Sequence, residues 1–158
     1  MIESVLGFVG HPAVMVGSGV LTLGCAVWMK LNYRGVSPDL GSLKSVDAWH
    51  HFVADPATGL SVGYRRNRTI DQWFPLCYLV CFLGLFAHTE LPLFAYLCPV
   101  AATLCDYSEN HLIAVSTDRA RAGRLSAVDV DRVVYASRVK WVMAGFSVCF
   151  LLASALGA

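Results

Sequence analysis

Three runs of eighteen residues, 12–29, 72–89 and 141–158, contain no Asp, Glu, Lys or Arg. A helix that crosses the roughly 30 Å hydrocarbon core of a bilayer needs about 20 residues, most of them apolar. Of the 158 residues, 56% are hydrophobic and only 15% are charged, whereas a soluble domain has about 45–50% apolar and about 25% charged residues. The sequence therefore predicts an all-α integral membrane protein in which each of these runs forms a spanning helix.

A fourth apolar segment, 91–105, is too short to span a bilayer by itself. No Gly or Pro occurs in residues 106–116, so we expect one helix to continue through them. Pro92 falls in its first turn, where proline is tolerated, and Pro99 is expected to kink it. The prediction is one membrane domain over residues 1–158, a four-helix bundle with spans at about 12–31, 70–88, 91–116 and 139–157.

The twelve Lys and Arg residues are confined to two segments of the chain. One runs from Lys30 to Arg68 between the first two spans, and the other runs from Arg119 to Lys140 between the last two. Loops rich in Lys and Arg lie on the cytoplasmic or equivalent side of a membrane. Four spans place both segments on that side, whereas an odd number would distribute the cations over both sides. We therefore expect a multi-pass protein with both termini on the outer side.

Residues 45–54 place apolar side chains at helical spacing between a Gly-, Ser- and Pro-rich linker at 35–41 and the Asp55–Pro56 pair. This pattern predicts a short amphipathic helix in the membrane interface, with Trp49 at headgroup depth. Further contacts with lipid or the interface are expected from Arg65, Arg66, Arg68, Trp73 and Trp141.

Polar residues within or beside the predicted spans form a second pattern. Asp106, Glu109 and Asn110 have i, i+3, i+4 spacing and therefore share one helix face. Ionisable groups in spans usually face the bundle interior and have partners. We expect Lys140 or Arg138 to pair with Glu109 or Asp106, and Asp71 to pair with an arginine of 65–68. The predicted polar cluster comprises Asp71, Asp106, Glu109, Asn110, Arg138 and Lys140.

Besides a third span that ends early and leaves these residues facing water, two interpretations of this cluster are open. In the first it is a clasp of ion pairs and hydrogen bonds that fixes the register of the helices. In the second it is a site for a lipid headgroup, an ion or the polar group of a substrate, since paired carboxylates serve in acid–base catalysis and hold hard cations.

The sequence predicts no catalytic residue, metal site or cofactor. It contains none of the motifs GxSxG, HExxH, GxxxxGK[ST] and GxGxxG. The six cysteines all fall within predicted spans and are expected to act as small packing residues. An alternative metal or haem site would depend on His11 and His88, which with Glu90 are expected at the outer boundary.

Small residues in the first span, including Gly10, Gly17, Gly19 and Gly24, permit close approach of another helix. Packing within the bundle is the expected use, and an interface with a partner is the alternative.

Several short motifs occur in a fixed order: Tyr64-Arg-Arg, Asp71-x-x-Phe74-Pro75-x-x-Tyr78, Asp106-x-x-Glu109-Asn110 and Lys140-Trp141. Their set resembles a group of small four-span integral membrane proteins of unassigned function. The resemblance covers about residue 59 to the C-terminus, and the Gly63-Tyr64 pair departs from the Gly-Arg of the group. It implies a four-helix membrane bundle and no reaction.

The predicted function is that of a non-catalytic accessory or structural subunit of a larger membrane complex. Its expected partners are other membrane protein subunits and membrane lipids, with no nucleic acid. The alternative is a membrane-embedded lipid, ion or small-molecule site, for transport or hydrolysis, built on Asp106, Glu109 and Asn110.

Overall fold

The structure is a computed structural model that describes residues 2–32, 43–54 and 62–157. This part of the chain is helical apart from short connections and contains no strand. Its elements are α1 (Ile2–Val9), α2 (Pro12–Asn32), α3 (Val46–Ala54), α4 (Val62–Ala87), the 3₁₀-helix η1 (Leu93–Tyr96), α5 (Leu97–Arg121) and α6 (Ala127–Gly157). The predicted all-α class is confirmed for these residues. The predicted linker at 35–41 and the predicted helix stop at 55–56 lie outside them.

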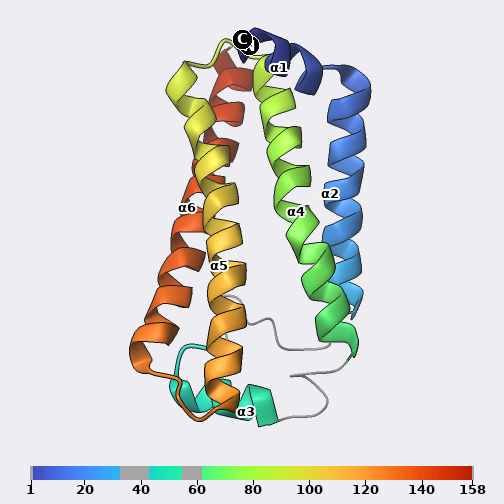
Figure 1. Cartoon of the computed structure of the whole chain (residues 1–158). Coiled ribbons are helices and arrows are strands. Elements are labelled where there is room, and N and C mark those ends of the chain that lie inside the picture. Colours follow the sequence, from blue (N-terminus) through green and yellow to red (C-terminus); the bar gives the residue numbers. More distant parts are fainter. Residues whose placement is uncertain (1, 33–42, 55–61, 158) are drawn as a thin grey trace.

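The four long helices form two antiparallel pairs that lie side by side (Figure 1). The most extensive contacts join α2 to α4 and α5 to α6, and the two pairs meet where α4 packs against α5. α1 lies across the end of the molecule where α6 finishes, and it packs mainly on α4. α3 lies at the opposite end, against α5. The first and last helical turns of the described chain therefore lie at one end of the molecule.

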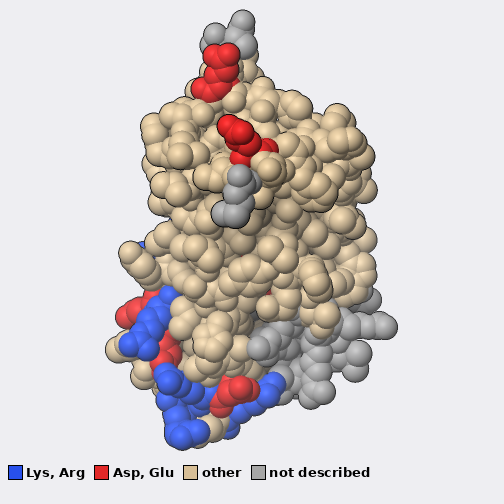
Figure 2. Space-filling model, turned by 45° about the horizontal axis from the view of Figure 1, so that its top comes forward, with Lys and Arg blue, Asp and Glu red and all other residues tan. Residues whose placement is uncertain are grey.

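Charged residues are distributed unevenly along the length of the molecule. Figure 2 shows Lys and Arg gathered at the end formed by α3 and the α5–α6 connection, separated from the other end by a broad band of mostly uncharged surface. The exposed cations at that end include Lys44, Arg119, Arg121, Arg124 and Arg132. The molecule therefore has one basic end, opposite the end that holds α1.

Within the described residues, three helices are long and apolar enough to cross a membrane: Pro12–Leu31, Thr69–Ala87 and Ala127–Leu156. Many of their large apolar side chains face outward, among them Val20 (65% exposed) and Leu152. A soluble monomer seldom exposes so large an apolar surface. These helices support a membrane protein, in agreement with the apolar runs of the sequence.

α5 has 25 residues and is roughly 37 Å long at 1.5 Å per residue. It is not among the three apolar helices because it carries the polar residues of 106–111. It also differs from the predicted helix at 91–116, since it begins only at Leu97, after η1. Pro99 therefore lies in its first turn, where a missing N–H breaks no helical hydrogen bond, and the predicted internal kink is wrong. Its other end reaches Arg121, five residues beyond the predicted Ser116.

A Schellman turn ends α5, and a capping box starts α6. Gly123 has φ +63°, and Arg124 N–H donates to the Arg119 carbonyl at 2.8 Å. Ser126 N–H then donates to Asp129 Oδ2 at 3.1 Å, while Asp129 N–H donates to Ser126 Oγ at 3.3 Å. Arg119 also forms an ion pair with Asp129. α6 continues from there to Gly157 without a break, so it begins twelve residues before the predicted span at 139–157.

α3 corresponds to the predicted amphipathic helix, but its apolar face contacts protein. Trp49 is 0% exposed, and its indole N–H donates to the Leu43 carbonyl at 3.1 Å. It belongs to a hydrophobic core with Leu43, Phe52, Ile113, Ala120, Leu125, Val130 and Val133. The expectation that the Trp49 side chain contacts lipid is therefore wrong, whereas its position at headgroup depth stays a prediction. The end of the α5–α6 pair provides an apolar surface on which the indole is buried with its hydrogen bond satisfied.

The helix α1, which sequence reasoning did not anticipate, is held against α4 at close range. A Cβ atom at Gly84 would lie 2.6 Å from the Val9 carbonyl oxygen, so only glycine permits this approach. His88 Nε2 lies 2.7 Å from the Gly10 carbonyl oxygen. By contrast, a Cβ atom at Gly17 or Gly24 would meet no described atom within 4 Å.

Candidate functional site

A buried ion-pair cluster lies where α4, α5 and α6 meet. Lys140 of α6 places its Nζ 3.3 Å from Asp106 Oδ1 and forms a second ion pair with Glu109, both on α5. From α4, the Tyr78 hydroxyl donates to Asp106 Oδ2 at 3.2 Å. Glu109 is 0% exposed, Asp106 is 3% exposed and the Lys140 side chain is 12% exposed. We refer to Tyr78, Asp106, Glu109 and Lys140 as the ion-pair cluster.

Helical spacing brings these groups together. Asp106 and Glu109 are one turn apart on α5, so a single ammonium group on the facing helix can contact both carboxylates. Removal of such charges from water costs several kcal/mol per ion, which close ion pairs and additional hydrogen bonds offset. The cluster therefore couples the positions of three helices, and loss of one member would leave a charge buried.

A second connection between α4 and α5 depends on a proline. Pro75 lies inside α4, where it has no N–H to donate to the carbonyl of Asp71, four residues earlier. The Asn110 side chain, which is 8% exposed, donates through Nδ2 to that same carbonyl at 3.3 Å. The D-x-x-F-P and E-N motifs thus meet, since one provides a carbonyl that lacks its i+4 N–H donor and the other provides a side-chain donor.

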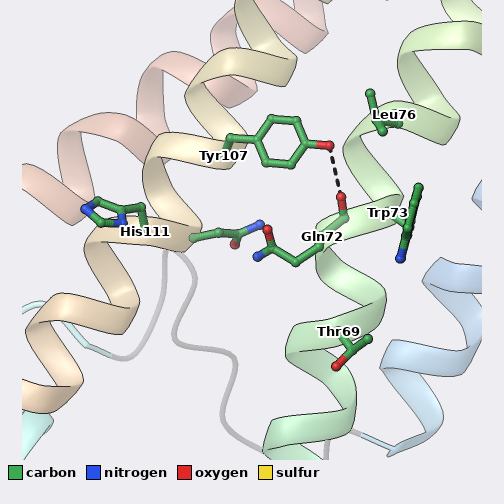
Figure 3. Close-up of a pocket in the computed structure, with 7 residues that line it drawn as sticks. Thr69, Gln72, Trp73, Leu76, Tyr107 and His111 are labelled. Atoms are coloured by element: carbon green, nitrogen blue, oxygen red, sulfur yellow. Dashed lines mark hydrogen bonds between the residues drawn. The ribbon is translucent and has the colours of Figure 1, made fainter.

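The next carbonyl of α4 also receives a hydrogen bond from α5. The Tyr107 hydroxyl donates to the Gln72 main-chain oxygen at 2.9 Å (Figure 3). Successive carbonyls at the proline site are therefore both connected to α5, which fixes the register of the two helices. Sequence reasoning assigned no role to Tyr107 or Tyr78. The position of Tyr78 seven residues after Asp71, on the same helix face, was the available signal.

The other predicted members of the polar cluster are placed differently. Arg138 is exposed on α6, and it is Lys140 that contacts the carboxylates. Asp71 joins the site through its main-chain carbonyl. The side chains of Arg65, Arg66 and Arg68, predicted to pair with Asp71, lie outside the described part of the structure. Trp73 and Trp141 are both exposed, and the Trp141 ring centroid lies 5.6 Å from Lys140 Nζ.

A groove of about 710 Å³ lies between α4 and α5. It is bordered by side chains from both helices, namely Thr69, Gln72, Trp73, Leu76, Tyr107, Asn110 and His111 (Figure 3). Asn110 is the one lining residue that also belongs to the predicted polar cluster. Asp106, Glu109 and Lys140 do not line this groove.

Residues considered for metal binding have other surroundings. Among the described residues, no group of three His, Cys, Asp or Glu side chains is arranged to hold a metal ion. All six cysteines are described, and all are free thiols. His88 connects α4 to the turn after α1 through the Gly10 carbonyl, which gives it a structural contact at that end of the molecule.

Comparison of the chain with protein-family models, with curated proteins and with solved structures finds no match. The resemblance to a group of four-span membrane proteins stays a prediction.

Proposed function

We propose that this chain is a four-span integral membrane protein and that it acts as a non-catalytic structural or accessory subunit of a larger membrane complex. The fourth span is α5. Three polar side chains within it are turned away from the outer surface, since Asp106, Glu109 and Asn110 are each less than 9% exposed. Ionisable groups within membrane helices are tolerated in this arrangement, facing the bundle and paired. The low hydropathy of α5 is therefore compatible with a membrane position.

The proposed orientation places the basic end on the cytoplasmic or equivalent side and both termini on the outer side. The gathering of Lys and Arg around α3 and the α5–α6 connection supports it (Figure 2). So does the position of α1 and the last turn of α6 together at the other end (Figure 1).

The observation that supports the subunit role most strongly is a stripe of small residues along the outer face of α2. Ala13, Gly17, Val20, Gly24 and Val27 follow one another at i, i+4, i+7, i+11 and i+14, so they form one stripe along the helix. Gly17 and Gly24 have no described neighbour within 4 Å of a Cβ position. Small residues at helical repeats allow two membrane helices to approach closely. The expected packing within the bundle does not use these two glycines, which favours a helix of another subunit as the occupant.

The ion-pair cluster supports the same role. Its carboxylates contact an ammonium and a tyrosine hydroxyl from two neighbouring helices. A ligand at Asp106 and Glu109 would have to displace Lys140 from both ion pairs. This favours a clasp over the alternative of a lipid, ion or substrate site for transport or hydrolysis.

The test is extraction of native membranes in mild detergent, then native electrophoresis and mass spectrometry of the band that holds this chain. We expect migration with a fixed set of other membrane proteins. Gly17→Leu combined with Gly24→Leu should release the chain from that set. Gly145→Leu is the matched control, because Gly145 of α6 also has no described neighbour within 4 Å of a Cβ position. Migration of the natural chain as a monomer or small homo-oligomer would exclude the subunit role.

A further inference from the structure

The groove between α4 and α5 lies at the boundary of the proposed membrane span and has a polar part and an apolar part. Thr69, Gln72 and Leu76 follow one another at i, i+3 and i+7, so they line the groove from one face of α4. Thr69 is the first residue of the apolar segment Thr69–Ala87, and Leu76 lies roughly 10 Å further along the helix axis. The groove thus begins at the boundary of the proposed span and extends about two turns into it.

The chemistry of the lining changes along this axis. At the boundary end it offers the hydroxyl of Thr69 and the amide of Gln72. Deeper in the span it offers Leu76 and Trp73, and Trp73 is 64% exposed. A polar end followed by an apolar end is the order in which a phospholipid presents its headgroup and its acyl chains. The volume also lies within the range of about 300–1,000 Å³ that is typical of small-molecule sites.

The charge at this end of the molecule defines the kind of lipid. The exposed cations at the basic end include Arg119 and Arg121 of α5, the helix that forms the other side of the groove. All twelve Lys and Arg residues belong to the two segments that we assign to this side of the membrane. Basic residues near a membrane surface attract anionic lipids, and the attraction increases with each cation.

We infer that the groove binds one anionic phospholipid, with its phosphate beside Thr69 and Gln72 and an acyl chain along Leu76 and Trp73. This inference rests on the proposed membrane positions of α4 and α5, and it is independent of the subunit role. Indole rings prefer the headgroup level, where one edge meets water and the ring meets hydrocarbon. The exposed ring of Trp73 would lie beside the first part of the acyl chain. The lipid would complete the surface between two helices that touch less extensively than either helix pair.

Native mass spectrometry of the detergent-purified full chain tests the inference. Phosphatidylglycerol and phosphatidylcholine with identical acyl chains are added in turn, and the lipid-bound fraction is measured. We expect one phosphatidylglycerol to remain bound preferentially. Trp73→Ala and Gln72→Ala should each weaken binding roughly threefold to tenfold, a change typical of losing one aromatic or hydrogen-bonding contact. The matched controls are Tyr135→Ala and His50→Ala, which alter exposed residues outside the groove and should retain the lipid.

A further variant, Leu76→Trp, keeps every polar lining group and fills the apolar end. It should reduce lipid binding while the helical circular dichroism stays unchanged, which separates occlusion from misfolding. Equal retention of both lipids, or equal losses in the groove variants and the controls, would overturn the inference. Binding of soluble glycerol 3-phosphate as tight as that of the lipid would show a phosphate site without a lipid role. Recovery of the natural chain in the aqueous fraction without detergent would instead overturn the proposed membrane function.

Discussion

Asn110 donates its side-chain amide to the main-chain carbonyl of Asp71, the carbonyl that Pro75 leaves without its i+4 N–H donor. The hydrogen bond is 3.3 Å long and joins residues 39 positions apart. It explains why a proline is acceptable inside a helix that is apolar enough to span a membrane. In such helices, a neighbouring helix often satisfies the backbone groups that proline frees.

This relationship predicts that Asn110 and Pro75 are energetically coupled. Asn110→Ala should destabilise the protein by about 0.6–2 kcal/mol, the range measured for hydrogen bonds between membrane helices. In a Pro75→Ala background the same change should cost less, because the N–H at position 75 then serves the Asp71 carbonyl. A double-mutant cycle on unfolding in detergent measures this difference. Additive costs would show that the amide does not replace the missing helical hydrogen bond, and Ser108→Ala at an exposed position is the control.

The clasp predicts a compensating pair of substitutions. Lys140→Met alone leaves two buried carboxylates without their ammonium, and removal of one partner of a buried pair typically costs about 3–5 kcal/mol. Glu109→Gln should also destabilise, because it leaves the ammonium with one carboxylate fewer. The double variant should recover much of what either single change loses, since fewer charges stay unpaired. Thermal unfolding in detergent gives the three values.

Arg138→Met is the matched control for this pair, because Arg138 is an exposed cation two residues from Lys140. It should change stability by less than about 0.5 kcal/mol. If all the single changes are silent in folding and in phenotype, the ion-pair cluster does not fasten the helices. If the double variant folds well but the cell still lacks the function of the protein, the site interpretation is favoured over the clasp.

The sequence predicts the helices and the principal ion pairs because both follow from local rules. A long uncharged run of residues by itself indicates a spanning helix. The i, i+3 spacing of Asp106 and Glu109 places both carboxylates on one helix face, where Lys140 contacts them. To predict that Lys140 rather than Arg138 contacts the carboxylates, one must know how α6 is rotated about its axis. That rotation depends on how the whole helix packs. The periodicity of a uniformly apolar helix does not define that rotation.

Other features depend on contacts between distant segments. An amphipathic helix such as α3 has the same pattern whether its apolar face meets lipid or protein, so the burial of Trp49 was not predictable from residues 45–54. The role of Asn110 required Pro75 to be paired with an acceptor four residues before it and a donor on another helix. The close approach at Gly84 arises from α1, a short helix whose eight residues carry no span signal.

The buried indole predicts that α3 is held to the basic end mainly by Trp49. Trp49→Ala should cost about 3–5 kcal/mol, the usual range for loss of a buried aromatic side chain, and it should release α3 locally. Hydrogen exchange is expected to accelerate in residues 43–54 and at the facing ends of α5 and α6 around Ile113 and Val130. His51→Ala, at an exposed position of the same helix, should leave exchange unchanged. Unaltered exchange in the Trp49 variant would contradict an anchoring role for this side chain.

The proposed topology predicts which surface residues meet each side of the membrane. Glu90 lies between α4 and η1, and Ala122 is the C-cap residue that follows α5, so a spanning α5 places them on opposite sides. Both are exposed, which makes Glu90→Cys and Ala122→Cys suitable labelling positions in a chain without other cysteines. In sealed vesicles of known orientation, a membrane-impermeant maleimide should label the first from the outer side only and the second from the cytoplasmic side only. A third variant, Arg132→Cys, lies at the exposed start of α6 and should follow Ala122→Cys. Labelling of residues 90 and 122 from one side would mean that α5 does not cross the membrane, and the protein would then have three spans with its termini on opposite sides.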